Sequence, residues 1–161
     1  MKILVLSDSH DNIVRLNHVM GFGQAQGFDA VIHCGDWNTP LAVSEISKSP
    51  IKLYGVLGNA DVDKKMEQLL FGICEEFNPD FLELNLDNKK IGICHYPTGL
   101  DTPALSQEYD ILFFGHTHIA KNQKYKKTQI VNPGALHRTN SPSFAVYDTE
   151  NDQVEIIDVM V

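Results

Sequence analysis

Five short apolar runs, each followed at once by a polar motif, constrain the fold more than any other feature of this sequence. The runs span residues 2–6, 30–34, 51–57, 91–94 and 111–114. Their length and their content of β-branched residues predict buried strands. Helical spacing follows the first run, from Asn12 with Asp11 as the expected N-cap, and a second helix is expected over 41–47. This β-α-β-α-β order predicts parallel strands joined by right-handed crossovers.

The second half of the chain has a different hydrophobic pattern. Alternation over 81–86, a turn at 87–90 and a return over 91–94 predict a hairpin. We expect a short helix over 102–108 and, apart from the run at 111–114, strands over 122–126, 128–131, 144–147 and 154–159. The expected fold class is α/β, with two packed β-sheets and helices outside them. No repeat or linker interrupts the 161 residues, which predicts one domain over 1–161.

Charge and composition exclude several classes of function. The formal net charge of -8 disfavours an extended nucleic-acid surface and binding to anionic membranes. No run approaches the roughly 20 apolar residues of a membrane span, and Asp8 interrupts the N-terminal run too early for a signal peptide. The scattered Cys34, Cys74 and Cys94 show no CxxC pairing, so we expect free thiols and a reducing cytoplasm.

The polar motifs at the strand ends carry the chemistry. They are Asp8-Ser9-His10, Gly35-Asp36, Gly58-Asn59-Ala60-Asp61, His95 and Gly115-His116-Thr117-His118. In α/β sheets the carboxyl ends of the strands converge on one crevice, where ligands bind. The sequence therefore brings seven candidate metal ligands to one place. They are Asp8, His10, Asp36, Asn59, His95, His116 and His118.

Two carboxylates, an amide and four imidazoles form a ligand set without thiolate. Such a set suits Mn, Fe, Ni, Co or Zn better than Ca or an iron–sulfur cluster. Seven ligands exceed the needs of one ion and are about right for two ions that share a bridge. On an extended segment His116 and His118 point the same way, about 6.5 Å apart at the backbone, so each imidazole can serve one of two ions.

Each motif by itself also has an ordinary structural explanation. Asp8-Ser9-His10 can be a helix-entry turn, Gly35-Asp36 a common turn pair, Asn59 a left-handed turn residue and His95 a satisfied buried histidine. The pair His116 and His118 has little packing rationale. The ordered occurrence of all five motifs at successive strand ends favours a metal site over coincidence.

This ordered set resembles the calcineurin-like metallophosphoesterases, and most closely their compact YfcE-like phosphodiesterase branch. Asn132-Pro133-Gly134-Ala135 is similar to the Asn-Pro-Gly-Ser turn of that branch. The resemblance spans nearly the whole chain. It implies two mixed β-sheets packed as a sandwich flanked by helices, in four layers, with the metals at the sheet edge.

The resemblance also implies roles for the ligands. Asp8, His10 and His118 would hold the first ion, and Asn59, His95 and His116 would hold the second. Asp36 would bridge the two, which makes Asp36, Asn59 and His95 the expected catalytic residues. A metal-bridging water would attack the phosphorus of a small phosphate ester. The cofactors would be two divalent transition-metal ions, with Mn favoured and Ni, Fe, Co or Zn as alternatives.

The sequence departs from the family pattern at three places. Ala60 stands where many members have a histidine that assists the leaving group, and Asp36 is followed by Trp37-Asn38-Thr39, which interrupts the common Gly-Asp-x-x-Asp pattern. Both changes favour phosphodiesters over monoesters. Tyr96-Pro97 follows His95 in place of the usual glycine, which changes the entrance to the substrate site.

Four further residues each have two possible roles. Arg138 is a candidate phosphate contact or an exposed cation, and Trp37 is a candidate pocket wall or a core residue. His33 is expected to be structural or to support a ligand, and Asp61 either orients a ligand or caps the next segment.

Two other functions compete with an enzyme of this kind. A catalytically weak relative could act as an interaction module, as the small phosphoesterase-like subunit of retromer does. The complete ligand set favours the enzyme. An amidohydrolase-type barrel needs about 250 residues and opens on a different motif. The sequence leaves the substrate, the metal and a homo-oligomer open.

Overall fold

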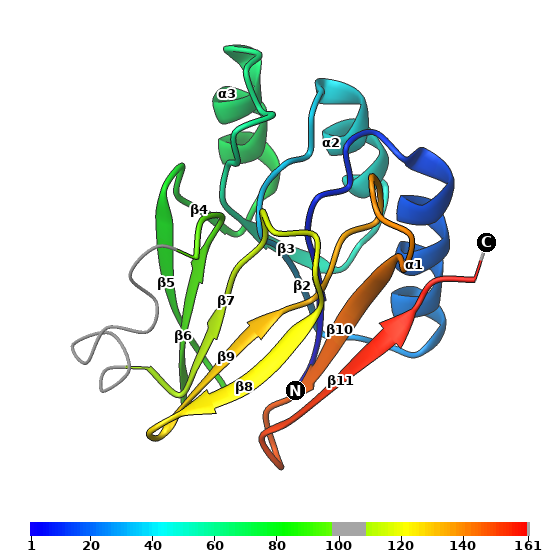
Figure 1. Ribbon diagram of the computed structural model, residues 1–161. Helices are drawn as coiled ribbons and strands as arrows, with labels where there is room; N and C mark the ends of the chain where they lie inside the picture. The colour runs from blue at the N-terminus through cyan, green and yellow to red at the C-terminus, as the bar shows by residue number, and fades with distance from the viewer. Residues whose placement is uncertain (98–108, 161) are drawn as a thin grey trace.

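The computed structural model describes residues 1–97 and 109–160, and it contains two mixed β-sheets packed face to face with three helices on one side (Figure 1). The six-stranded sheet has the order β11-β10-β1-β2-β3-β4. Its strands are β1 (Lys2–Leu6), β2 (Ala30–His33), β3 (Lys52–Gly55), β4 (Glu76–Phe77), β10 (Ser143–Asp148) and β11 (Gln153–Asp158). Strands β1 to β4 pair in parallel, and β10 and β11 are added in antiparallel.

The second sheet has five strands in the order β5-β6-β7-β9-β8. They are β5 (Phe81–Leu86), β6 (Lys89–Cys94), β7 (Ile111–Phe113), β8 (Lys121–Tyr125) and β9 (Thr128–Asn132). Strands β6, β7 and β9 are parallel neighbours, whereas β5 and β8 pair in antiparallel at the two edges. The β5–β6 pair is the hairpin that the alternation over 81–94 predicts.

Residues of β1 alternate between the two faces of the first sheet. Leu4 and Leu6 pack with Leu16 and Val19 against the helical layer of α1 (Ile13–Ala25), α2 (Pro40–Ile46) and α3 (Lys65–Ile73). Ile3 and Val5 face the second sheet, where they join a cluster that includes Ile91, Ile93, Ile111 and Phe113. Burying each such side chain contributes about 1.5–3 kcal/mol. The sandwich therefore has one core between the sheets and one under the helices.

The expected fold class, α/β with two packed mixed sheets, is confirmed. The helix expected over 102–108 lies outside the described residues, so the helical layer described here covers the six-stranded sheet. No helix in the described part of the chain is long and apolar enough to span a membrane.

Two local predictions differ from the structure. The N-cap of α1 is Asn12, whose side chain accepts the Arg15 N–H at 3.2 Å, and not Asp11. The Asp11 carboxylate accepts hydrogen bonds from Asn38 and Thr39 instead, because the two loops lie side by side. Helix α3 and strand β4 were not predicted. Although only Met66 and Leu70 of α3 are buried, the apolar residues Met66, Leu69, Leu70 and Ile73 follow helical spacing, so the pattern for this helix is present in the sequence.

Candidate metal centre

The seven candidate ligands come from loops that begin at the carboxyl ends of β1, β2, β3, β6 and β7. Backbone contacts join these loops. The Asp8 N–H donates to the carbonyl of Gly35 at 3.0 Å, and the Gly115 N–H donates to the carbonyl of His95 at 3.0 Å. The second contact joins two loops of one sheet, while His95 Nδ1 lies 2.8 Å from the carbonyl of Cys34 and connects the two sheets.

Four of the seven side chains form one tight group. Asp8, His10, Asp36 and His118 each offer a ligand atom, and these atoms all lie within 4.8 Å of one another. The Nε2 atoms of His10 and His118 are 3.3 Å apart. His118 Nε2 lies 3.2 Å from Asp8 Oδ1, and His10 Nε2 lies 3.4 Å from Asp36 Oδ2.

The remaining three side chains form a second group on the other side of Asp36. Asn59 Oδ1 lies 2.9 Å from His116 Nδ1 and 3.1 Å from His95 Nε2. His95 Nε2 also lies 3.4 Å from Asp36 Oδ1. Asp36 therefore turns one oxygen toward each group.

The donor atoms fit metal ions. Bonds of about 2.0–2.2 Å set neighbouring ligand atoms roughly 3.0–3.4 Å apart around one ion, which is the spacing seen in both groups. Asp8 Oδ1 lies 3.2 Å from His118 Nε2, but the two groups do not have the geometry of a hydrogen bond. This oxygen is fully buried and has no hydrogen-bond partner among the described residues. A buried carboxylate in this position needs a cation.

The protonation state also suits metal binding. Desolvation lowers the pKa of His10 to about 4, with the charge of Arg138 adding to the effect and the charge of Asp36 opposing it. The imidazole of His10 is therefore neutral at pH 7, and the neutral form is the one that binds metals. Burial raises the pKa of the Asp8 carboxyl, because desolvation disfavours its charged form.

Five of the seven candidate ligands have a left-handed backbone. The φ angles are 52° at Asp8, 40° at His10, 59° at Asp36, 66° at His116 and 58° at His118. Such angles are uncommon outside glycine, and they cluster at functional sites where the surrounding structure imposes them. The fold therefore holds these side chains in place at a conformational cost.

Two glycines allow the loops to approach closely. A Cβ atom at Gly58 would lie 2.2 Å from Asp36 Oδ1, and one at Gly115 would lie 2.0 Å from Ser7 Oγ. Either side chain would displace a loop that carries ligands.

The supporting residues lie behind the ligands. Asp61 accepts the backbone N–H groups of Asp36, Gly58 and Asn38, and burial raises its pKa to about 6. Its structural role is therefore to join two ligand loops. The sequence left two interpretations of Asp61, which were orientation of Asn59 or a histidine and capping of the next segment. The three backbone contacts are a different arrangement from both.

Buried Asn132 has a similar role, which sequence reasoning missed. It donates to the carbonyl of Gly115 at 2.8 Å and lies 3.0 Å from Thr117 Oγ1. It thus braces the loop that carries His116 and His118. The Asn-Pro-Gly turn was the sequence feature from which this role could have been inferred.

Trp37 lies in the core rather than at the pocket wall. Its side chain is 0% exposed, its Nε1 donates to the carbonyl of Val56 and its ring stacks on His33 with centroids 3.6 Å apart. The ring is therefore not available to a substrate in this structure, because packing directs it inward. His33 is also fully buried, with Nε2 3.0 Å from Ser9 Oγ. Arg138 is exposed, and its carbonyl lies 3.3 Å from His118 Nδ1.

Comparisons with known proteins agree with this geometry. The model of the calcineurin-like phosphoesterase superfamily domain matches residues 1–152. The phosphodiesterase MJ0936 of Methanocaldococcus jannaschii is 28% identical over 159 residues, which cover 95% of this chain and 96% of that protein.

Solved structures share the fold. An archaeal phosphodiesterase superposes with a TM-score of 0.90 at 27% identity, covering 99% of this chain and 100% of that one. YfcE, a phosphoesterase from E. coli, superposes with a TM-score of 0.74 at 19% identity, with 99% and 100% coverage. The strand-end motifs and the two-sheet fold agree with the family match. Because that match covers residues 1–152, the chain belongs to the calcineurin-like phosphoesterase superfamily.

Proposed function

We propose that this protein is a binuclear metal-dependent phosphodiesterase that acts on a small phosphate ester. The convergence of six candidate ligand side chains on the two sides of a seventh, Asp36, is the observation that carries the proposal. The resemblance of the chain to a protein named phosphodiesterase supports diesters as the substrate class.

In this proposal Asp8, His10 and His118 hold one ion and Asn59, His95 and His116 hold the other. Asp36 is shared, since its two oxygens face the two groups. Two bound divalent cations, Mn favoured and Ni, Fe, Co or Zn as alternatives, would supply a bridging hydroxide as nucleophile and neutralise charge on the phosphate.

The residues of the chain orient the reaction. Ala60 donates its backbone N–H to Asp36 Oδ1 at 2.7 Å, which fixes the shared carboxylate. Asn59 Oδ1 lies between His95 and His116 in the second group, and Arg138 is a candidate contact for a phosphate oxygen. Because Ala60 offers no proton to a leaving group, diesters with good leaving groups are the expected substrates. The three cysteines are free thiols, which is consistent with a cytoplasmic enzyme.

The test is hydrolysis of a chromogenic phosphodiester and its matching monoester by chelator-stripped protein. Mn, Ni, Zn or Mg is then restored, with Asp36→Asn assayed alongside. Turnover that returns with metal, prefers the diester and disappears in Asp36→Asn supports the proposal. Absence of both turnover and metal binding would overturn it and favour an interaction module.

A further inference from the structure

A pocket of about 380 Å³ opens beside the metal centre. Its wall includes Leu57, Pro79, Asp80, Cys94, His95 and Tyr96. Since His95 is also a proposed ligand of the second ion, the pocket and the metal centre share a side chain. The volume lies at the small end of the range for ligand pockets, which suits one ring better than a large ligand.

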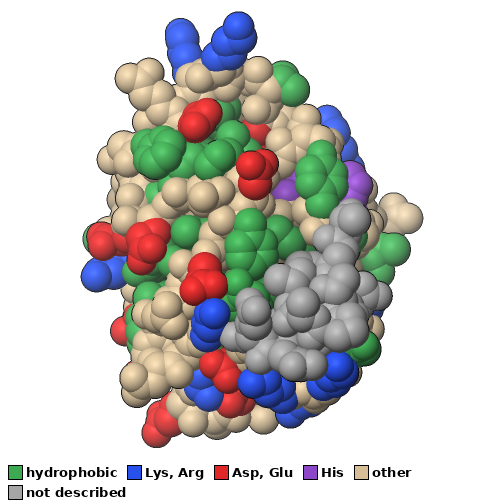
Figure 2. Space-filling model, turned by 90° about the vertical axis from the view of Figure 1, so that its left-hand side faces the viewer, with side chains coloured by type: hydrophobic (Ala, Val, Ile, Leu, Met, Phe, Trp, Pro, Cys, Tyr) green, Lys and Arg blue, Asp and Glu red, His purple; other side chains and the backbone are tan. Residues whose placement is uncertain are grey.

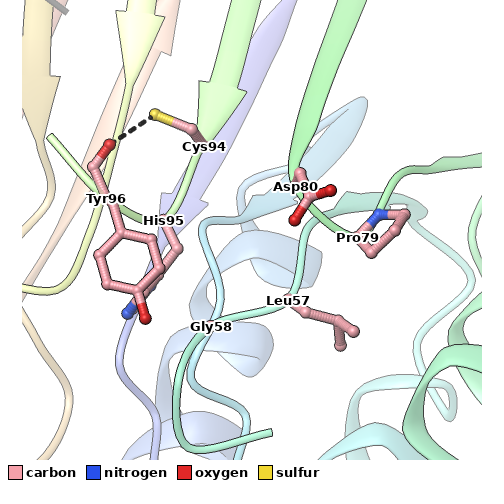
Figure 3. A pocket seen from close by; sticks show the side chains of 7 residues that line it. All are labelled: Leu57, Gly58, Pro79, Asp80, Cys94, His95 and Tyr96. Carbon is pink, nitrogen blue, oxygen red and sulfur yellow. Dashed lines mark hydrogen bonds between the residues drawn. The ribbon is translucent and has the colours of Figure 1, made fainter. Parts of the chain in front are cut away.

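The two sides of the pocket come from different segments (Figure 3). Cys94, His95 and Tyr96 follow one another at the end of β6, and Leu57, Pro79 and Asp80 stand opposite. Burial raises the pKa of the Cys94 thiol to about 12, so this side chain is uncharged at pH 7. On the side of the molecule that Figure 2 shows, hydrophobic side chains lie next to histidines, with acidic side chains among them.

Tyr96 is an exposed aromatic residue that is held in place. Its side chain is 48% exposed, yet its ring centroid lies 4.8 Å from that of His116 and 5.1 Å from that of His95. These contacts hold one part of the ring against two proposed metal ligands and leave another part open. An exposed ring fixed in this way is a suitable platform for stacking a planar group.

Asp80 gives the pocket a negative edge. Asp80 is exposed, and no hydrogen-bond donor among the described residues pairs with its carboxylate. A carboxylate in the wall of a pocket repels an anionic group that enters it and accepts a hydrogen bond from a neutral donor.

We infer that this pocket binds one ester substituent of the phosphodiester as a planar aromatic ring stacked on Tyr96, and that Asp80 selects against substituents that carry a further negative charge. The inference rests on the proposed function, since the phosphate itself lies at the metal centre. The expected substrates are aryl or nucleoside diesters with one compact ring. Dialkyl diesters and diesters with an additional phosphate are not expected to be substrates.

Binding of uncleaved analogues to the Mn-loaded protein tests this inference by calorimetry. Methyl phenylphosphonate and methyl methylphosphonate carry the same charge and differ in the ring alone. The ring is attached through a P–C bond, and the one remaining ester has methoxide as a poor leaving group. We expect the wild-type protein to prefer methyl phenylphosphonate by about fivefold. Tyr96→Ala should remove the preference, and Tyr96→Phe should keep it. Phe71→Ala is the matched control, because Phe71 is an exposed aromatic residue of α3 outside the pocket.

An unchanged phenyl preference in Tyr96→Ala would overturn the stacking role, and Tyr96→Leu replaces that variant if it does not fold. Equal binding of both esters by the wild type would overturn the pocket assignment and leave the phosphodiesterase proposal standing. Failure of both esters to bind protein that holds two ions would contradict both proposals.

The role of Asp80 has its own comparison. Methyl (para-carboxyphenyl)phosphonate should bind the wild-type protein several-fold more weakly than methyl phenylphosphonate, and Asp80→Asn should reduce this difference. An equal difference in the two proteins would remove Asp80 from the inference. The methylphosphonate ester of uridine then separates the two sources of the ring. Tighter binding than methyl phenylphosphonate indicates a nucleoside substrate, and weaker binding indicates a simple aryl ester.

Discussion

The Oδ2 atom of Asp61 accepts a hydrogen bond of 3.0 Å from the backbone N–H of Asp36. The same oxygen accepts the Gly58 N–H at 2.7 Å, and Oδ1 accepts the Asn38 N–H at 2.7 Å. One carboxylate thus ties the loop after β2 to the loop after β3. Asp61 thereby fixes the position of the residue that faces both groups of candidate ligands.

Replacing Asp61 by Asn should loosen this junction. An amide nitrogen cannot accept the N–H groups that Oδ2 now accepts, so at least one backbone donor loses its partner, at a cost of about 1–3 kcal/mol. Metal affinity should fall by roughly 10–100-fold, as for other groups that support ligands. Urea unfolding and metal titration measure the two effects. Wild-type metal affinity in this variant would refute the positioning role.

Asp36→Asn should weaken both metals together, because its two oxygens face the two groups. We expect a loss of more than about tenfold at each site, measured as metal content per chain during dialysis against a series of metal concentrations. Asp158→Asn is the matched control, since Asp158 is an exposed carboxylate at the end of β11. Loss of one ion with full retention of the other would show that Asp36 is not shared.

Ala60→His should shift activity towards monoesters. A positioned imidazole can protonate a poor leaving group, and general acids contribute roughly 10²–10⁴-fold. The ratio of kcat/KM for the diester to kcat/KM for the monoester should therefore fall by about tenfold or more. Ala60→Gln controls for side-chain bulk. If the histidine variant keeps the wild-type ratio, Ala60 does not explain the diester preference.

Trp37→Phe tests whether Trp37 belongs to the core or to the substrate site. The variant loses the hydrogen bond to the carbonyl of Val56 and part of the stack on His33. We expect a loss of about 1–3 kcal/mol in the free energy of unfolding and a KM within about twofold of the wild type. A large rise in KM at unchanged stability would show that Trp37 contributes to the substrate site.

Acidification should destabilise the metal-free protein. Desolvation lowers the pKa of His33 well below 6.5, and desolvation lowers the pKa of His10 to about 4. Below pH 6.5 the unfolded chain therefore binds protons that the folded chain does not, and stability falls by up to about 1.4 kcal/mol per pH unit for each histidine. Asp61, with a pKa of about 6, opposes this between pH 6 and 3.8, since its folded form binds the extra proton. Asp8, whose pKa is also raised by burial, acts in the same direction as Asp61.

The net slope is thus expected to follow the two histidines. Urea unfolding of the chelated protein at pH 7 and pH 5 should give a lower free energy of unfolding at pH 5. His33→Gln should make this pH dependence shallower, whatever its effect on absolute stability. An identical pH dependence in the variant would show that His33 does not remain neutral in the folded protein.

The fold class and the positions of the candidate ligands could be predicted because they rest on local patterns. Strand runs reveal themselves by length and by alternation, and parallel strands bring their carboxyl ends to one edge. These patterns predict that Asp8, Asp36 and His95 lie at one edge of the sandwich, although they are far apart in sequence. Helix α3 was not predicted although Met66, Leu69, Leu70 and Ile73 follow helical spacing, and no side-chain cap marks its start.

Sequence by itself determined which residue types stand at the strand ends, and therefore the chemistry available to this protein. Only the tertiary structure decided which way each side chain points. Trp37 turns inward to stack on His33, Asp61 accepts backbone N–H groups, and Tyr96 is exposed beside the metal centre. These directions depend on packing between segments that are distant in the chain and on left-handed backbone angles imposed by that packing, and neither is encoded in the local periodicity from which sequence reasoning proceeds.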